Sequence, residues 1–563
     1  MVDYKNGPLK QAIQTSGRGD VKPKKILLVS PDSGVVSTER LYFAPPLGVM
    51  RLAGYLSVKG HDAEYYDPNL YACNGQGLDL TGKLEEKEWD IIGFSALDET
   101  LVQDIQNMYL ARKLSPNSLI IAGGIEAQFN YQTLLDKSPC RIVILGEGEV
   151  PLLMLANEEP WEKIPGIVAK NLAEALSQEV FNEATETIPW ETINYEDYWD
   201  VYIDIYKDQW NEEIADQIKT VRIFSRNRCP IGCKYCSSTP QLTLATGGKV
   251  PVISTTEDTL ISVVDRVVKS HPDTRMIYLT DDDFVINKLS VMKFCQKAIE
   301  RDFGALIFMC FARITDLTEE VIDWMSRANF RKLNIGVETF SQKILDEVGK
   351  RCDADRIHST LSLLKQYNIR PFCNIILSTP QSTLEDVEVT LTEVLRYLDD
   401  DYYQFGVIPA IYPLKGTEFA EMYCDFKSHI VEIPGTEFNI RRDDYIYSED
   451  PVMREFQIRF IEGVDEAVEK FIEENEVRHA NAASLAYFKC MFATKLVQEL
   501  KEEVKDGDVQ WSTDNTAGAG RIYAEKAVLQ KNNSYRDEPS EELRIELNTV
   551  ASIPGDESRH KLV

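Results

Sequence analysis

The stretch VRIFSRNRCPIGCKYCSSTP, residues 221–240, joins a short apolar run to three closely spaced cysteines, Cys229, Cys233 and Cys236. The apolar run predicts a buried strand, and the polar continuation with its proline and glycine predicts a loop at the strand's carboxyl end. The chain has 11 cysteines among 563 residues, so three of them within eight positions are unexpected from composition. This spacing points to metal ligation.

The kind of metal depends on a fourth ligand, which this stretch lacks. A structural zinc site takes four Cys or His ligands, but the nearest histidine is His271, and Cys295 and Cys310 fall in predicted helix and strand segments. Three thiolates instead suit an iron–sulfur cluster in which one iron has no protein ligand. Pro230 and Gly232 allow the tight wrap that such a cluster requires. On the residues alone, zinc or a chance grouping is the alternative.

Three basic residues flank the cysteines: Arg226, Arg228 and Lys234. The thiolate, and not the thiol, is the form that binds a metal, and nearby positive charge stabilises it. We therefore expect these residues to lower the thiol pKa values and to favour ligation.

Alternating strand and helix patterns continue to residue 410. Helix-length segments separate five further apolar runs, which are RMIYLTDD (275–282), ALIFMCFAR (305–313), RKLNIGVE (331–338), PFCNIILST (371–379) and YYQFGVIPA (402–410). Six β/α units are too few for a closed eight-stranded barrel, and they predict a partial (β/α)6 barrel of the TIM type over residues 219–415. Chemistry in such barrels lies at the carboxyl ends of the strands, where the cysteines also lie.

The CxxxCxxC spacing, with Tyr235 directly before the last cysteine and a six-unit barrel around it, resembles the radical S-adenosylmethionine (radical SAM) superfamily. The resemblance covers residues 221 to about 415. It implies a 4Fe–4S cluster on the three cysteines, with an open iron that chelates S-adenosylmethionine, and reductive cleavage of that cofactor to a 5′-deoxyadenosyl radical. It also implies that Tyr235 lies near the adenine, and that a protein such as flavodoxin or ferredoxin donates the electrons.

Four residues at predicted strand ends match the superfamily more loosely. Asp282 and Asp283 follow the second strand, where a carboxylate would pair with the methionine ammonium group, although a solvated acidic turn fits equally well. Arg313 after the third strand is a candidate for the methionine carboxylate, and Glu338 after the fourth is a candidate contact of the same cofactor. Structural ion pairs are the alternative for these two. The segment ILSTPQSTLED (376–386) departs from the glycine-rich sequence usual after the fifth strand, which leaves its adenosyl contacts open.

Residues 24–157 show strand and helix patterns of the same kind, with helix candidates at 45–60, 99–114 and 127–137. The predicted strands are KKILLVS (24–30), DAEYYD (62–67), DIIGFSA (90–96), SLIIAGG (118–124) and RIVILGEGE (141–149). Short runs that are almost wholly apolar are typical of parallel strands buried on both faces. We therefore predict an α/β fold that begins with a flavodoxin-like, doubly wound parallel sheet, followed by the partial barrel and a mainly helical C-terminal region.

Upstream of a radical SAM barrel, this sheet resembles the cobalamin-binding domain of the cobalamin-dependent radical SAM enzymes. APPLGVMRLAGYL, DIIGFSA, IIAGG and ILGEGE all resemble that class. The resemblance implies a cobalamin held by loop backbone amides and by a helix start. The residues concerned are Ser95, Ala96, Gly123, Gly124, Gly146, Glu147 and Gly148. A structural domain that binds nothing is the alternative.

One departure from cobalamin mutases concerns the lower face of the cobalt. Those enzymes carry Asp-x-His-x-x-Gly after the first strand, whereas SPDSGVVSTERLYF (30–43) has no histidine, and the first one downstream is His61. We expect the lower face to be unligated or held by another group, as is usual in the radical class.

The remaining segments are less regular. Residues 158–218 are rich in Trp, Tyr and acidic residues, and we interpret them as an irregular linker packed on both neighbours. Residues 416–505 are expected to cap the open side of the barrel and to set the substrate, with RRDDYIYSEDP (441–451) either at the entrance or in a surface loop. The polar tail 506–563 is weakly patterned. The apolar stripe expected on the capping helices is Phe456, Phe460, Ile461, Val464 and Val468.

Composition narrows the class of protein. A formal net charge of −30 and a hydrophobic content of 44% indicate a folded, acidic chain that would be repelled by nucleic acid or an anionic membrane. The N-terminal residues contain no apolar signal-peptide core, and no apolar run is long enough to span a bilayer. We expect a cytoplasmic protein with reduced cysteines and a small-molecule substrate, without a nucleic-acid or membrane partner.

The leading hypothesis is methylation of an unactivated carbon of a small molecule or natural product. The same two domains also occur in cyclases and rearrangement enzymes that transfer no methyl group. Methylthiotransferases carry a different N-terminal domain with its own three cysteines, which Cys73 and Cys140 cannot supply. A hypothesis from another class is a non-catalytic cobalamin- or redox-sensing module, which would not need the acidic and basic residues at the strand ends.

Overall fold

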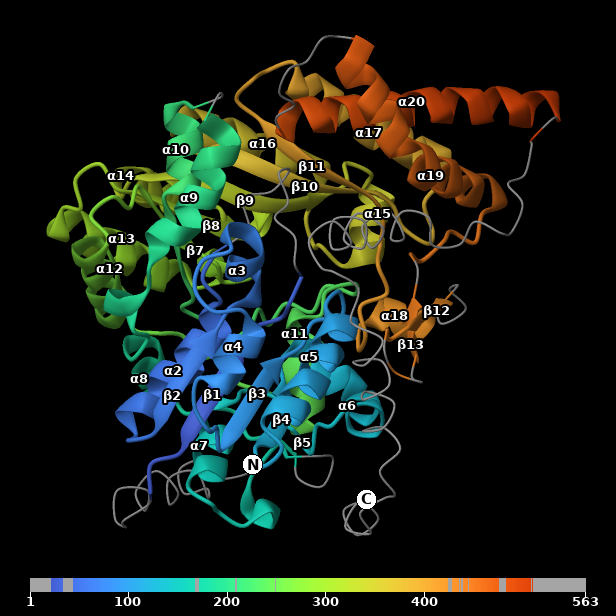
Figure 1. The fold of residues 1–563 in the computed structure, drawn as a ribbon. Coiled ribbons are helices and arrows are strands. Elements are labelled where there is room, and N and C mark those ends of the chain that lie inside the picture. Colours follow the sequence, from blue (N-terminus) through green and yellow to red (C-terminus); the bar gives the residue numbers. More distant parts are fainter. Residues whose placement is uncertain are drawn as a thin grey trace.

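The computed structural model describes residues 22–33, 44–167, 172–207, 210–248, 250–423, 428–434, 436, 439–443, 445–474, 482–507 and 509. These residues form two parallel sheets, helices that join and cover them, and a pair of long C-terminal helices (Figure 1). In this part of the chain, no helix has both the length and the apolar character that a membrane crossing requires.

The first sheet has five parallel strands in the order β2-β1-β3-β4-β5. Its strands are β1 (Lys25–Val29), β2 (Asp62–Tyr66), β3 (Ile91–Ser95), β4 (Leu119–Gly123) and β5 (Ile142–Val143). Because β1 lies between β2 and β3, the chain reverses its direction across the sheet there, and such a switch point is where open sheets bind ligands. The order confirms the flavodoxin-like, doubly wound prediction.

Six helices belong to this sheet: α2 (Leu47–Val58), α3 (Pro68–Asn74), α4 (Leu80–Glu85), α5 (Leu101–Leu114), α6 (Ile125–Lys137) and α7 (Glu149–Ala156). Strand β5 is shorter than its apolar run predicted. After it, Ile144 makes an antiparallel bridge to Ile167, and the chain turns at Gly146, which has a φ of 78°. The residues that follow therefore form a loop and the start of α7.

The second sheet has six parallel strands in sequential order, β6 to β11. They are β6 (Thr220–Ile223), β7 (Met276–Leu279), β8 (Ile307–Ala312), β9 (Phe330–Glu338), β10 (Arg370–Ser378) and β11 (Gln404–Ala410). Since β6 and β11 are the two edges of the sheet, the barrel is open between them. The predicted partial barrel of six β/α units is confirmed.

Helices cover the outside of the barrel: α12 (Glu257–Ser270), α13 (Lys288–Arg301), α14 (Glu319–Arg327), α15 (Gln342–Val348), α16 (Ala354–Gln366) and α17 (Leu384–Leu398). Helix α11 (Ser238–Thr246) instead contacts α6 of the first domain. Aromatic residues join this layer to the sheet. Phe294 of α13 packs edge-on against Phe308 of β8, with ring centroids 5.5 Å apart, and Phe308 lies 5.3 Å from Phe330 of β9.

Residues 158–218, predicted to be irregular, instead contain three helices, α8 (Gln178–Glu186), α9 (Tyr195–Tyr206) and α10 (Glu212–Ile218). The prediction was wrong because the aromatic residues of α9 recur at helical spacing: Tyr195, Tyr198, Trp199 and Tyr202 are buried, and the acidic residues lie at positions that are not buried. These helices pack on both sheets, since α8 contacts α2 and α12, and α9 contacts α3.

Two long helices, α19 (Pro451–Glu474) and α20 (Ala482–Asp506), occupy the region where two were predicted. The predicted apolar stripe lies on α19 and is buried against α20 and β11, with Val464 only partly covered. Buried Gln457 ties α19 to the barrel by donating to Ser378 Oγ at 2.8 Å. Before these helices lie α18 (Glu418–Met422) and an unpredicted hairpin of β12 (Ser428–Glu432) and β13 (Asn439–Asp443). The polar tail after residue 509 lies outside the described residues.

Candidate functional site

The three cysteines lie on the loop between β6 and α11, at the carboxyl end of β6. Gly232, with a φ of 70°, lets the chain turn within the loop. The Cys236 N–H donates to the Cys233 carbonyl oxygen at 3.0 Å, and the Cys229 N–H donates to Ser238 Oγ at 3.0 Å. All three thiols are free of disulfides and half-buried. We call residues 226–237 the cysteine loop.

The donor set of the cysteine loop fits an iron–sulfur cluster. Among the described residues, no three His, Cys, Asp or Glu side chains converge as a single metal ion would require. A cluster binds each thiolate through a different iron, so it needs three separate sulfur atoms and not one common point. Three thiols on one turn, without the fourth ligand of a tetrahedral zinc site, meet that need.

The expectation that flanking basic residues lower the thiol pKa values is wrong for two of the thiols. Burial raises the pKa of Cys229 to about 12 and that of Cys236 to about 11. Arg226 and Arg228 donate to backbone carbonyl oxygens, and the Lys234 ammonium lies 3.4 Å from a glutamate. The hydrogen bonds and the ion pair of these residues thus go to other partners, and their charges do not offset the burial of Cys229 and Cys236. Deprotonation of the ligands would then depend on the metal itself.

The structure brings Tyr235 and Glu338 together and adds a residue that sequence reasoning missed. The Tyr235 hydroxyl donates to Glu338 Oε1 at 2.7 Å, and Lys350 Nζ lies 2.8 Å from the same oxygen. Gly336 makes room for this group, because an added Cβ would overlap Glu338 Oε1 and lie 2.6 Å from Lys350 Nζ. Lys350 follows α15, away from any strand end, so no sequence signal marked it.

Asp282 contacts the residue that directly follows the cysteine loop. Its carboxylate accepts a hydrogen bond from Ser238 Oγ, the same hydroxyl that accepts the Cys229 N–H. Its neighbour Asp281, which the sequence analysis did not consider, is buried and accepts from the Ser225 N–H at 2.7 Å. Burial raises the pKa of Asp281 to about 6. Asp281 therefore braces the start of the cysteine loop.

Asp283 and Arg313 face each other. Arg313 Nε lies 3.7 Å from Asp283 Oδ2 and 3.1 Å from Asp316 Oδ2. Asp283 is buried and accepts the Val285 N–H at 3.2 Å, which caps a short 3-10 turn. Burial raises the pKa of Asp283 to about 7. The arrangement is the ion pair that the sequence left open as the alternative for Arg313.

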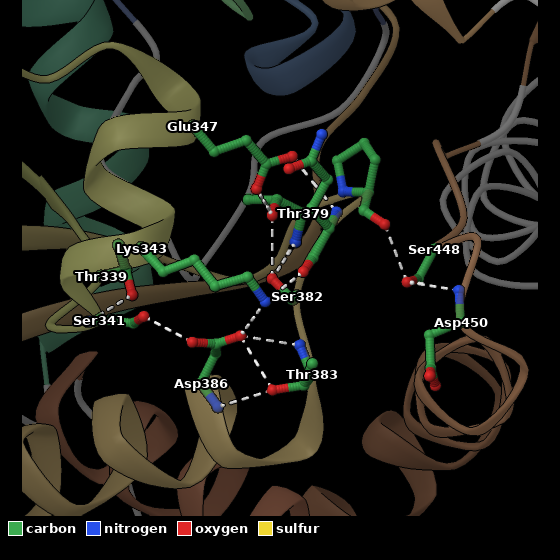
Figure 2. A network of polar contacts seen from close by, with 12 residues as sticks. Thr339, Ser341, Lys343, Glu347, Thr379, Ser382, Thr383, Asp386, Ser448 and Asp450 are labelled. Atoms are coloured by element: carbon green, nitrogen blue, oxygen red, sulfur yellow. Dashed lines mark hydrogen bonds and ion pairs between the residues drawn. The ribbon is translucent and has the colours of Figure 1, made fainter.

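Hydroxyl side chains at the end of β10 and just after it form hydrogen bonds within the protein. Ser378 and Thr379 are fully buried; Ser378 Oγ donates to a backbone carbonyl at 2.7 Å, and Thr379 Oγ1 contacts Glu347 and Ser382 Oγ. Figure 2 shows this turn held between Glu347 on one side and Asp386 on the other. Both hydroxyls are thus used within the protein, and neither faces the barrel lumen.

A cavity of about 460 Å³ opens at the carboxyl ends of β3 and β4. Of the seven residues predicted to hold cobalamin, six line it: Ser95, Gly123, Gly124, Gly146, Glu147 and Gly148. Ala96 does not; it is buried beneath, and its N–H donates to the Gly123 carbonyl oxygen at 2.9 Å. The opposite wall comes from the barrel and the residues around the cysteine loop, with Phe224, Asn227, Gln241, Leu242 and Thr280.

This cavity lets a ligand approach the backbone closely. A Cβ added at Gly123 would meet only the Ile144 carbonyl oxygen, at 3.8 Å, so the loop presents bare backbone to the open space. Burial raises the pKa of Glu147, which lines the cavity, to about 7. Among the described residues that line it there is no histidine, and most of the segment 30–43 lies outside the described residues.

The barrel lumen is a second cavity, of about 1030 Å³, with Tyr235 and Glu338 in its lining. The C-terminal region contributes to its wall through α20, whereas described residues 445–451 of the predicted entrance segment do not line it. The sequence analysis missed the wall formed by α9, which supplies four aromatic side chains. They are Tyr198, Trp199, Tyr202 and Tyr206.

Two family models match the chain. A model of the B12 binding domain matches residues 34–156, and a model of the radical SAM superfamily matches residues 223–394. The first match covers the first sheet, and the second covers the barrel from β6 to α17.

Curated relatives include a methyltransferase and a cyclase. The chain is 25% identical over 415 residues to an uncharacterized methyltransferase of Pyrococcus horikoshii, covering 71% of this chain and 83% of that protein. It is 24% identical over 386 residues to the anaerobic magnesium-protoporphyrin IX monomethyl ester cyclase of Rubrivivax gelatinosus, covering 65% of this chain and 64% of the cyclase. The chain thus spans just under two thirds of the cyclase's length.

Two solved structures share the fold. OxsB, a cobalamin-dependent radical SAM enzyme solved with aqua-cobalamin and S-adenosylmethionine, has a TM-score of 0.59 at 14% identity, covering 91% of this chain and 84% of its own. TsrM from Kitasatospora setae, a radical SAM methyltransferase solved with cobalamin and a [4Fe–4S] cluster, has a TM-score of 0.58 at 13% identity, covering 85% of this chain and all of its own.

The cofactors that go with the two matched domains are a 4Fe–4S cluster, S-adenosylmethionine and cobalamin. With a B12 binding domain followed by a radical SAM barrel on one chain, the protein belongs to the cobalamin-dependent radical SAM enzyme family.

Proposed function

We propose that the protein is a methyltransferase that acts on an unactivated carbon of a small-molecule substrate. The observation that carries this proposal is the position of the cysteine loop between the two cavities. Asn227 at its start and Gln241, just beyond its end, line the cavity of the first sheet, while Tyr235 within it lines the barrel lumen. Ligands of the two cavities would therefore meet at the cysteine loop, as methyl transfer from one to the other requires.

The bound cofactors would supply reductive cleavage of S-adenosylmethionine and a methyl carrier. Within this proposal, the three cysteines hold the cluster, and Tyr235, Asp282 and Glu338 contact S-adenosylmethionine. Lys350 fixes the Glu338 carboxylate through their buried ion pair. Asp283 and Arg313 position the neighbouring strand ends, because Arg313 Nε lies between the carboxylates of Asp283 and Asp316 and is closer to Asp316. We also propose a cytoplasmic location and a flavodoxin or ferredoxin as electron donor.

Cobalamin binding is predicted to depend on the bare backbone at Gly123. Gly123→Phe should weaken cobalamin binding by about tenfold or more. The Cβ of the phenylalanine would fit without a clash, and its ring would extend into the cavity that Gly123 lines and fill part of it. Gly123→Ala is the matched control, since its methyl group fits beside Ile144. Cobalamin retained after gel filtration would be measured by its absorbance. Equal retention by Gly123→Phe and the wild type would contradict the assignment of this cavity.

A second candidate function is ring formation or rearrangement without methyl transfer. The similarity to the Rubrivivax gelatinosus cyclase, at 24% identity over 65% of this chain, favours it. A sensing module without catalysis is less well supported, because the large lumen beside Tyr235 and Glu338 is suited to a substrate.

One anaerobic incubation tests these candidates. The reconstituted protein would be supplied with reductant, S-adenosylmethionine and hydroxocobalamin, and the small molecules would be read by mass spectrometry. We expect both 5′-deoxyadenosine and S-adenosylhomocysteine to accumulate. Formation of 5′-deoxyadenosine alone would favour the cyclase or rearrangement candidate, and formation of neither would leave only the sensor.

A further inference from the structure

We propose that the barrel lumen recognises its substrate by an oxyanion, a carboxylate or a phosphate, which Lys332 and Lys489 hold, and by a flat apolar body that lies against α9. This inference rests on the proposed function in one respect, because it takes the lumen to be the substrate cavity. It adds a chemical class for the substrate of this chain, argued from the lining of the lumen.

The first observation is the charge of the lumen. Its lining contains four basic side chains and three acidic ones, whereas the whole chain has 61 basic and 91 acidic residues. The basic ones are Arg222, Lys332, Arg370 and Lys489, and the acidic ones are Glu213, Glu338 and Asp401. Glu338 is in addition neutralised by Lys350, which does not line the lumen. An acidic protein therefore encloses a cationic cavity, which attracts anions from the surrounding solvent.

The second observation is the state of Lys332 on β9. Its ammonium group is buried and donates no hydrogen bond. The acidic oxygen at ion-pair distance is Glu213 Oε1 at 3.6 Å, beyond hydrogen-bond length. Glu213 is itself held by Arg370 at 2.8 Å and by Gln404 at 3.3 Å. A buried ammonium with three unused N–H donors is costly, and an oxyanion in the lumen would satisfy it.

Lys489 of α20 is a second cation of the lumen with unused donors. It is half-buried in the lining, and within the described part of the chain its side chain has no ion-pair or hydrogen-bond partner. Arg370 differs, because its donors go to Glu213 and to backbone carbonyl oxygens of Asp401 and Tyr402. Of these three side chains, Lys332 and Lys489 are therefore the ones with donor capacity left for a ligand.

The third observation is the shape of the apolar lining. The four aromatic side chains of α9 line the lumen together with Met276 and Met309 from the sheet. Aromatic faces and thioethers pack well against flat or unsaturated apolar groups. Lys332 lies six residues before Glu338 on β9, which at the usual rise of a strand is about 20 Å. A substrate that reaches from Lys332 toward the cysteine loop is therefore elongated, with its anionic end at the amino-terminal side of the barrel.

Fluorescent probes of matched shape test the proposal without turnover. We would titrate the cofactor-loaded full chain with 1-pyrenebutyrate, 1-pyrenebutyl phosphate and the neutral 1-pyrenebutanol. At least one anion should bind about tenfold more tightly than the alcohol, as expected for a charge-assisted hydrogen bond. Lys332→Met and Lys489→Met should each remove most of that preference. Lys297→Met, on the outer helix α13 where Lys297 pairs with Asp258, should leave it unchanged.

The outcomes separate the two proposals. The proposal that the substrate is an anion would be overturned if the alcohol and both anions bound equally well, or if neither lysine variant had an effect. The proposal that the lumen is the substrate site would be overturned if none of the three probes bound. The preferred anion distinguishes a carboxylate from a phosphate. Lys489→Met keeps the test valid if Lys332→Met does not fold, because Lys489 is partly exposed. Assaying 5′-deoxyadenosine in the same preparations reports on the proposed function independently.

Discussion

Replacing Cys233 with alanine is expected to abolish both the visible absorbance of the iron–sulfur cluster after anaerobic reconstitution and all formation of 5′-deoxyadenosine. Cys233 lies in the middle of the cysteine loop, and its carbonyl oxygen accepts the Cys236 N–H at 3.0 Å. No other thiol follows at a spacing that would replace it. The alanine keeps the backbone hydrogen bond, so the loss reports on the thiol and not on the fold.

Cys73→Ala is the matched control for this variant. Cys73 is a half-buried free cysteine on α3, outside both cavities, so its loss should leave the cluster and the cleavage unchanged. Anaerobic absorbance spectroscopy and mass spectrometry would be applied to both variants. Retained cleavage in Cys233→Ala would show that the cluster is held elsewhere.

Arg51→Met is expected to lower the free energy of unfolding by about 3–5 kcal/mol, the usual cost of breaking a buried ion pair. Arg51 of α2 is buried, and its Nε lies 2.6 Å from Glu149 Oε1. Its terminal nitrogens donate to Thr185 Oγ1 at 2.5 Å and to the Phe181 carbonyl oxygen at 3.2 Å. The guanidinium carbon also lies 4.4 Å from the centroid of the Phe181 ring. One side chain thus joins α2, α7 and α8, and its loss leaves the Glu149 carboxylate buried without its partner.

Chemical denaturation monitored by circular dichroism would measure this change, with two controls. Lys59→Met removes the more exposed ion pair to Glu183, and should change stability by about 0–1 kcal/mol. The double variant Arg51→Met, Glu149→Leu should recover part of the loss, because it removes the unpaired charge. Equal effects of Arg51→Met and Lys59→Met would contradict the role given to this buried pair.

The strands of both sheets could be predicted because their information is local. Wherever a parallel strand is buried on both faces, its sequence is a short apolar run, and KILLV of β1 is buried at four of its five positions. The cysteine spacing is equally local, since all three ligands lie on one turn. By contrast, the helical spacing of the buried aromatic residues of α9 is obscured in the sequence by the acidic and apolar residues between them, and the packing makes it plain.

Site residues could be predicted where they lie at the end of a strand. They could not be predicted where only a tertiary contact brings them to the site. Glu338 follows from its place after β9, but Lys350 reaches it from beyond α15, and Gly336 is needed only because those two side chains meet. The basic residues beside the cysteines illustrate the converse. Their charge is evident in the sequence, but tertiary contacts direct it to other acceptors, and burial sets the thiol pKa values.

Sequence alone suffices for the order of the two domains, the strands of each sheet and the three thiols of the cysteine loop, because each depends on residues that are neighbours along the chain. Only the tertiary structure decided which groups share a cavity. Lys332, Lys489 and Tyr202 come from β9, α20 and α9, and they line one lumen because the open barrel has to bury its interior against helices that precede and follow it in the chain. Burial and distance between such residues are properties of the packed chain, and they set the charge and shape that a substrate meets.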